Sequence, residues 1–140
     1  MLYSEFIKKP RNCPFCEKSN PIIKEDKFSY ITIATAPYHR HHLMVVPKRH
    51  IEKIFDATEE ENIEMLLLIK ASAEILTKLG YKNYSILVRE GDQSRTGKSV
   101  PHLHYHIVPD TALITKKHEH RTMMTEVEID EVVKELKNIL

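Results

Sequence analysis

The most regular pattern in the sequence is His102-Leu103-His104-Tyr105-His106-Ile107-Val108, in which histidine alternates with apolar or aromatic residues. Alternation with a period of two is typical of a β-strand, because successive side chains point to opposite faces of a sheet. The three histidines would share one face, with their Cα atoms roughly 6.5–7 Å apart. A row of three imidazoles is a poor core, since each buried ring needs polar partners. The pattern therefore predicts a strand at 102–108 whose histidine face carries chemistry.

Two kinds of chemistry fit this histidine face. In the first, alternate histidines hold a catalytic zinc ion. In the second, a neutral imidazole is a nucleophile toward phosphorus or a carbonyl carbon. The polar loop before the strand favours phosphate, because Gly97, Lys98 and Ser99 offer backbone N–H groups, a cation and a hydroxyl to anionic oxygens. These residues alone leave both chemistries open.

The remaining elements follow from the spacing of apolar residues. Strands are predicted for three short segments rich in β-branched and aromatic residues: 28–35, 42–46 and 84–88. Thr58 followed by Glu61 is typical of a helix start, and this helix is expected to end before Gly80. Residues 91–100 are expected to form a polar loop, and an apolar stripe predicts a last helix at about 128–140. The order β, β, α, β, β, α belongs to the α+β class.

The chain is expected to form one domain over residues 1–140. No repeat and no linker rich in glycine, proline or serine divides it. Residues 1–27 are expected to be a loop-rich lead-in, and residues 111–140 a C-terminal extension that ends in the last helix. The long helix is apolar nearly all round at Met65–Ile69, whereas a helix that packs once needs a single apolar stripe. Either this belt lies between the sheet and another element of the chain, or it contacts a second subunit.

Composition and charge exclude several classes of protein. The chain has 21 Lys and Arg against 20 Asp and Glu, a net charge of +1, which argues against broad nucleic-acid binding. The apolar belt is far shorter than the ~20 residues that span a bilayer, and the first ten residues show no secretory signal. We therefore expect a cytoplasmic protein without membrane association. In that compartment Cys13 and Cys16 indicate metal binding or redox activity rather than a disulfide.

Three motifs together resemble the histidine triad (HIT) superfamily. Residues 102–108 match its His-φ-His-φ-His-φ-φ pattern, where φ is apolar. Residues 42–51, His-Leu-Met-Val-Val-Pro-Lys-Arg-His-Ile, are similar to the family's histidine, apolar strand and basic turn, and residues 97–100 fit its Gly-x-Ser-Val. The resemblance spans about residues 13–109. It implies a HIT-like fold, an antiparallel sheet with one long central helix and a C-terminal helix, and a homodimer through the long helix and a neighbouring strand, as in Hint-like and Fhit-like members.

The resemblance also implies roles for individual residues. His104 matches the family nucleophile, which attacks the α-phosphorus of a nucleotide and forms a nucleotidyl-histidine intermediate that water cleaves. His106 and Ser99 match groups that hold phosphate oxygens and the leaving side, and Gly97 and Lys98 belong to the same substrate-binding loop. His42 matches the fourth histidine beside the triad. A backbone carbonyl that accepts from the other nitrogen of His104 would fix the attacking tautomer.

The two cysteines have a counterpart in the family as well. Several relatives, including galactose-1-phosphate uridylyltransferases, are similar in binding zinc through a CxxC motif and two histidines, which match His50 and His102 here. Together Cys13, Cys16, His50 and His102 would form a closed tetrahedral site of the structural type. The alternatives are two reduced thiols without metal, or a redox pair, which needs a βαβ context that is absent around residues 10–30.

The sequence departs from the family pattern at Ala34 and at Lys98. Ala34 stands where many Hint-like and Fhit-like members place an acid or an asparagine that holds the ribose hydroxyls. Lys98 stands where glutamine is common, and could bind a further phosphate, as in a dinucleoside polyphosphate. The basic run 116–121 is interpreted as a solvated loop rather than a tail that faces the substrate.

The motifs together predict a nucleotide hydrolase or nucleotidyl transferase that acts on a dinucleoside polyphosphate, a nucleoside phosphoramidate or a similar mixed nucleotide. Structural zinc is the expected metal, and no organic cofactor is expected. Two alternatives remain, a metalloenzyme with zinc on the histidine strand and a nucleotide-binding module without turnover.

Overall fold

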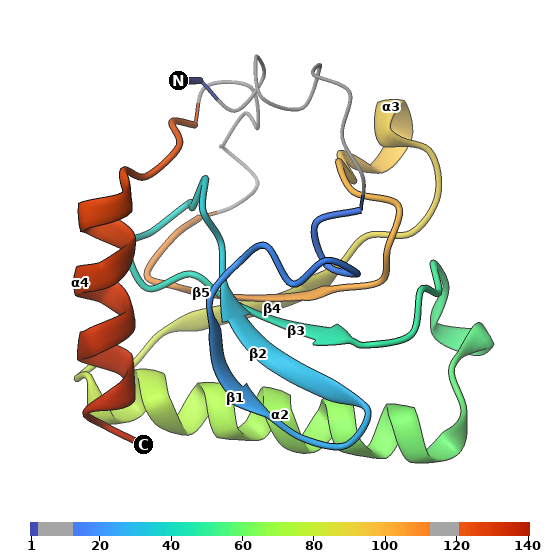
Figure 1. The fold of residues 1–140 in the computed structure, drawn as a ribbon, viewed down its shortest axis with the longest axis horizontal. Coiled ribbons are helices and arrows are strands. Elements are labelled where there is room, and N and C mark those ends of the chain that lie inside the picture. Colours follow the sequence, from blue (N-terminus) through green and yellow to red (C-terminus); the bar gives the residue numbers. More distant parts are fainter. Residues whose placement is uncertain (3–12, 113–120) are drawn as a thin grey trace.

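A five-stranded antiparallel sheet forms the centre of the protein (Figure 1). The computed structural model describes residues 1–2, 13–112 and 121–140. The strands, in chain order, are β1 (Ile22–Glu25), β2 (Ser29–Ile33), β3 (Leu43–Pro47), β4 (Tyr84–Val88) and β5 (Tyr105–Pro109). Across the sheet the order is β1-β2-β3-β5-β4, so β4 lies at an edge. The predicted α+β class is therefore confirmed.

Capping residues set where the helices begin. Helix α2 (Glu59–Lys78) begins after Thr58, whose side chain accepts from the amide of Glu61 while the Glu61 carboxylate accepts from the amide of Thr58. This is the capping box that the sequence predicts. Helix α4 (Glu126–Lys137) has the same arrangement at Thr125 and Glu128, and therefore begins two residues before the predicted 128. Two short elements, η1 (Ile54–Asp56) and α3 (Gln93–Thr96), lie in the connections.

Helix α2 covers one face of the sheet, and the loops that carry the chemistry lie on the other (Figure 1). Alternate strand residues pack beneath α2: Ile31, Ile33, Leu43, Val45 and Ile107. The residues between them point to the opposite face, where Tyr30, Met44 and Val46 form a smaller apolar cluster with Phe15 and Val100. The period-two pattern thus gives the sheet one face for the core and one for a site. No helix in the described part of the chain is long and apolar enough to cross a membrane.

Three larger differences separate the structure from the sequence prediction, besides shifts of one or two residues at the ends of other elements. Strand β1 lies within the expected loop-rich lead-in and pairs with β2 from Ile22 onward, although its own sequence is too short and polar to indicate a strand. Helix α3 interrupts the expected polar loop 91–100. Strand β5 begins at Tyr105 rather than at 102, because the Leu103 amide donates to the carbonyl of Ile51 (2.7 Å) instead of joining a ladder. Parts of the lead-in and of the C-terminal extension lie outside the described residues.

The apolar belt of α2 is divided between the core and the surface. Met65, Leu68 and Ile69 are buried against the sheet. Leu66 and Leu67 are 67% and 58% exposed. Ile63 is exposed one turn earlier, at the i, i+3, i+4 spacing that places it on the same helix face as the two leucines. The surplus apolar side chains therefore form an exposed stripe.

Candidate functional site

Four buried histidines gather where β3 and β5 adjoin. His104 immediately precedes β5, His106 is the second residue of that strand, and His42 immediately precedes β3. Antiparallel pairing of Met44 with His106 brings the two segments together. The structure keeps the predicted alternation even though 102–104 is not a strand, since Leu103 and Ile107 enter the core under α2. His104 and His106 consequently share the opposite face with His42, while His102 turns toward the cysteines.

The surroundings of His104 prepare one nitrogen as a nucleophile. Its Nδ1 lies 2.7 Å from the carbonyl oxygen of His102. Because a carbonyl oxygen can only accept, Nδ1 carries the proton and Nε2 keeps its lone pair. Burial lowers the pKa of His104 to about 4, which outweighs the raising effect of that hydrogen bond. The ring is therefore neutral near pH 7, as a nucleophilic imidazole must be.

A second chain of hydrogen bonds fixes His42 and His106. The amide of Tyr38 donates to Nδ1 of His42 (3.2 Å), so the proton of neutral His42 is on Nε2. That Nε2 lies 2.9 Å from Nδ1 of His106, which must accept, and this leaves the His106 proton on its own Nε2. Burial holds the pKa of both rings well below the usual value, so both are neutral. The site thus combines a lone pair on His104 with an N–H donor on His106.

A cavity of about 280 Å³ opens beside these histidines. Its wall includes the catalytic candidates His42, His104 and His106. Apolar side chains supply another part: Pro14, Phe15, Ala34, Ala36, Met44 and Val100. Polar groups complete the lining: Glu17, Ser19, Asn20, Thr35 and Arg121. An apolar pocket with a few polar groups beside neutral imidazoles is suited to a small ligand with one apolar ring and one reactive anionic centre.

The predicted substrate-binding loop, residues 97–99, lies next to the cavity in sequence but does not contribute to the described part of its wall. Gly97 ends α3 with a φ of +80°, a left-handed conformation that favours glycine. Lys98 is buried, and its ammonium donates to the carbonyl of Glu52 (3.0 Å). Among the residues that the structure describes, Gly97, Lys98 and Ser99 are absent from the cavity wall, whereas the neighbouring Val100 is part of it.

The interpretation of the basic run 116–121 as a solvated loop is wrong for Arg121, which lines the cavity. Its guanidinium lines the cavity, donates to the carbonyl of Ala36 (2.6 Å) and lies 4.2 Å from the ring centre of Tyr38. The Met124 amide anchors the same segment to the carbonyl of Thr35 (2.7 Å). The rest of the run, 116–120, lies outside the described residues.

The four predicted metal ligands converge on one point. The ligand atoms of Cys13, Cys16, His50 and His102 all lie within 4.8 Å of one another. Nδ1 of His102 is 3.4 Å from each sulfur and 3.1 Å from Nδ1 of His50. Tetrahedral zinc would place such atoms roughly 3.3–3.8 Å apart. Nε2 of His102 lies 2.8 Å from the carbonyl of Pro47 and donates to it, so Nδ1 offers a lone pair. The donor set fits zinc.

The loop between the two cysteines also builds the cavity. Pro14 and Phe15 both line it, and the Phe15 ring centre is 5.0 Å from that of His104 and 5.6 Å from that of His102. The only sequence signal for this contact is the apolar residue Phe15 inside the CxxC motif. The hydrogen bond from the Tyr38 amide to His42 could not be predicted from the sequence, because every residue except proline has the same backbone amide.

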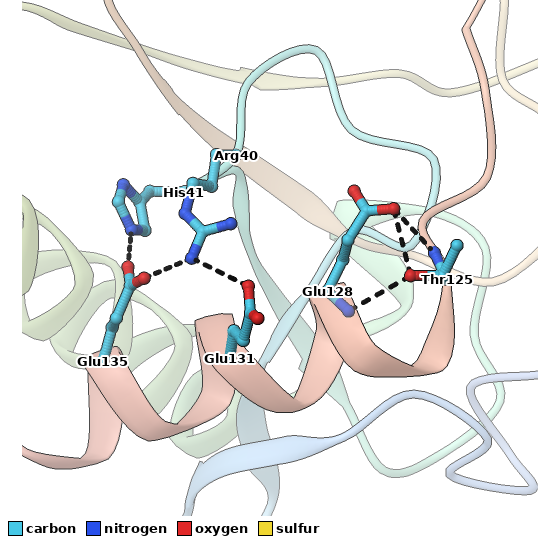
Figure 2. A network of polar contacts seen from close by, with 6 residues as sticks. All are labelled: Arg40, His41, Thr125, Glu128, Glu131 and Glu135. Carbon is cyan, nitrogen blue, oxygen red and sulfur yellow. Dashed lines mark hydrogen bonds and ion pairs between the residues drawn. The ribbon is translucent and has the colours of Figure 1, made fainter.

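Helix α4 contacts Arg40 and His41, the two residues before His42, and Figure 2 shows these contacts from Glu131 and Glu135. The Glu135 carboxylate accepts from Arg40 and lies 2.6 Å from Nε2 of His41. The Tyr81 hydroxyl lies 2.6 Å from Nδ1 of His41, on the other side of the ring. Glu131 is a weaker neighbour, 3.9 Å from Arg40. The C-terminal helix therefore fixes the two residues that precede His42.

Comparison with known proteins relates this arrangement to others. The model of the HIT domain family matches residues 16–113. The chain is 30% identical to an uncharacterized HIT-like protein of Methanocaldococcus jannaschii, over 89% of this chain and 98% of that protein. It is also 30% identical to an adenosine 5'-monophosphoramidase of Schizosaccharomyces pombe, over 70% of this chain and 74% of that protein. A solved zinc-bound histidine triad family protein of Mycobacterium smegmatis shares the fold, with a TM-score of 0.69, 23% identity and coverage of 91% and 92% of the two chains.

Proposed function

The chain belongs to the HIT domain family, and on that premise we propose that it is a nucleotide hydrolase or nucleotidyl transferase that reacts through His104. One observation carries the proposal. The carbonyl of His102 holds the Nδ1 proton of a buried, neutral His104, so its Nε2 lone pair is available beside the cavity. The relative from Schizosaccharomyces pombe, an adenosine 5'-monophosphoramidase by name, supports a nucleotide as the substrate.

The proposed reaction has two displacements at the α-phosphorus. Nε2 of His104 forms a bond to phosphorus, and the bond from phosphorus to the leaving group breaks and gives its electron pair to that group. Water, or another acceptor in a transferase, then forms a bond to phosphorus, and the P–N bond breaks to restore His104. In hydrolysis the products are a nucleoside monophosphate and the protonated leaving group.

His106 and His42 would support both steps. The N–H of His106 is an uncharged donor that can meet a phosphate oxygen or the leaving atom as negative charge develops there. His42 acts through His106, because its own N–H donates to the other nitrogen of that ring. Gly97, Lys98 and Ser99 are proposed as further contacts of the phosphate chain, with Ser99 nearest in sequence to Val100 of the cavity wall.

Zinc is proposed at the four-ligand site rather than on the histidine strand. Two imidazole nitrogens of this segment are unavailable to a metal on the histidine face: Nδ1 of His102 faces Cys13 and Cys16, and Nδ1 of His104 carries a proton that it donates to a carbonyl. Cys13, Cys16, His50 and His102 would hold the ion in a closed, structural site. A site with two thiolates also fits a reducing compartment such as the cytoplasm.

A homodimer is proposed through the exposed stripe of α2 and the edge strand β4. The stripe consists of Ile63, Leu66 and Leu67, and on β4 Tyr84 and Ile86 are 42% and 48% exposed. An unpaired strand edge beside exposed apolar side chains is suited to pairing with its own copy about a twofold axis.

Incubation with a panel of adenosine and guanosine phosphoramidates, dinucleoside polyphosphates and nucleotidyl sugars tests the function. Release of the mononucleotide, and capture of a phosphorus–nitrogen adduct on His104 by mass spectrometry after acid-free quenching, is the expected result. Tight nucleotide binding without release would instead identify a binding module. Turnover that follows added metal and survives loss of His104 would identify a metalloenzyme.

A further inference from the structure

Arg89 continues strand β4 onto the histidine face of the sheet. The antiparallel register pairs Leu87 with His106 and Val88 with Tyr105, so the next position places Arg89 opposite His104. Val88 and Tyr105 both pack against the core beneath α2. The ladder ends at Val88 and Tyr105, and Arg89 and His104 are the next residue of each chain segment. Because neighbours along an extended chain alternate faces, the same register continued by one residue puts Arg89 and His104 on the other face.

The Arg89 guanidinium is a half-buried cation for which the structure supplies no counter-charge. Within the described ranges 1–2, 13–112 and 121–140, it makes no hydrogen bond or ion pair. Its charge contributes to the lowered pKa values of His42 and His106, after burial and nearer charges, which agrees with a position close to the cluster. A guanidinium cannot release its proton, and its five N–H groups match anionic oxygens. An anion beside His104 is its natural partner.

The strand order gives the substrate a direction across the sheet. The cavity wall includes residues that follow β2, Ala34 and Thr35, and residues at β3, His42 and Met44. Strand β5 comes next and carries the reactive imidazole, and β4 lies beyond it. Arg89 is absent from the cavity wall among the described residues. A nucleoside in the cavity over β2 and β3 would therefore place its α-phosphorus at β5 and its leaving group over β4.

We propose that Arg89 binds the leaving group of the substrate, and that this leaving group is a phosphate chain, so that the preferred substrate class is the dinucleoside polyphosphates rather than the nucleoside phosphoramidates. The inference rests on the proposed function of the site and refines it. When His104 attacks diadenosine triphosphate, the P–O bond to the β-phosphate breaks and ADP leaves with the electron pair. Arg89 stabilises the negative charge that develops on that oxygen. A phosphoramidate loses a neutral amine after proton transfer, which a cation does not stabilise.

The experiment compares two substrates that share the adenylyl half. For Arg89→Gln, kcat/KM for diadenosine triphosphate is expected to fall by ~10- to 100-fold, the size of one charge-assisted contact, and kcat/KM for adenosine 5'-phosphoramidate by less than ~3-fold. Arg89→Lys should restore part of the loss. Lys82→Gln, which removes one positive charge from the exposed segment before the other end of β4, should leave both values unchanged. An equal fall for both substrates, or no fall for the triphosphate, would overturn the proposal.

A binding measurement distinguishes a failure of the role proposed for Arg89 from a failure of the proposed function of the whole site. By calorimetry, Arg89→Gln should weaken binding of a diadenosine triphosphate analogue with methylene bridges by about tenfold and leave AMP binding unchanged. If the parent chain bound AMP, and the parent and the variant bound the analogue equally, only the role of Arg89 would be wrong. If the parent bound neither AMP nor the analogue, the proposed function itself would be wrong, and this inference with it.

Discussion

Nδ1 of His104 donates to the carbonyl oxygen of His102, 2.7 Å away, while Nδ1 of His102 points to Cys13, Cys16 and His50. His102 thus faces the proposed metal site with its side chain and the proposed nucleophile with its backbone. The Leu103 amide donates to Ile51 and Nε2 of His102 donates to Pro47, so the backbone between the two histidines is fixed from both sides. The proposed metal site and the proposed reactive imidazole therefore share one segment that is hydrogen-bonded on both sides.

Replacing His104 by alanine is expected to abolish turnover and to change nucleotide binding by no more than about tenfold, roughly 1.4 kcal/mol. The reason is that the proposed mechanism takes its attacking lone pair from His104, whereas Phe15 and the other residues of the cavity wall would still be present to bind the nucleotide. Mononucleotide release and calorimetry measure the two effects. Substantial turnover in His104→Ala, on a substrate that the parent cleaves, would contradict the covalent mechanism.

The protein is expected to contain about one zinc per chain, as a closed four-ligand site implies. Replacing Cys13 and Cys16 together by serine should remove the ion and lower the thermal midpoint by ~10 °C or more. Activity at low temperature should fall less, because Pro47 and Ile51 still hold the segment at His102 and Leu103. Elemental analysis and thermal unfolding provide the readouts.

The matched control for the metal is Lys18→Ser, in an exposed residue of the same loop that contacts Glu25 and is not a ligand. It should retain zinc. Protein purified without chelators that contains no zinc would exclude the site. Zinc retained by the double cysteine variant would place the metal elsewhere in the chain.

Replacing Glu135 by glutamine is expected to lower kcat/KM by roughly 3- to 10-fold, because the turn before His42 loses its ionic contact with Arg40 and its anionic partner at His41. The free energy of unfolding should change by less than about 1 kcal/mol, since Arg40 and Glu135 are 41% and 39% exposed and solvent screens the pair. Kinetics and denaturant unfolding of the same preparations separate the two effects.

The matched control is Glu131→Gln, whose carboxylate lies 3.9 Å from Arg40 and has no contact with His41. Arg40, and after it His41, hold the pKa of Glu135 below its ordinary value of 4.5. A lowered pKa means that this contribution to stability is present at neutral pH and is lost as the pH falls through the folded-state pKa. Equal kinetic effects of the two glutamine variants would contradict a specific role for Glu135.

Replacing Leu67 by glutamate is expected to convert a dimer into a monomer of 16.4 kDa at micromolar concentration. A charge in the exposed α2 stripe would have to be buried against the partner copy. Val127→Glu is the matched control, because Val127 is similarly exposed (67% against 58% for Leu67) but lies on α4. Light scattering that finds the parent chain monomeric over a wide concentration range would refute the dimer. Leu68, an equally plausible position from the sequence, is unsuitable because it is 1% exposed.

The local features of the protein are determined by short-range sequence pattern. Alternation at 102–108 predicts which residues enter the core and which face the site, and the structure confirms this division for Leu103 and Ile107. The capping box of Thr58 and Glu61 predicts the start of α2 within one residue. Such features depend on neighbours a few residues apart, so the sequence carries them directly. The position of the four-ligand cluster required the family resemblance in addition to the pattern.

Long-range contacts were decided only by the tertiary structure. The sequence indicated Lys98 for phosphate and Arg121 for solvent, yet Lys98 reaches the carbonyl of Glu52 and Arg121, 85 positions from its acceptor Ala36, lines the cavity. No sequence motif includes Arg89, because its position near His104 depends on the register of β4 against β5. Lysine and arginine carry their charge at the end of a long, flexible side chain, so they can contact groups that are distant in the sequence. Which groups lie within reach depends on how the whole chain packs, and not on the adjacent residues.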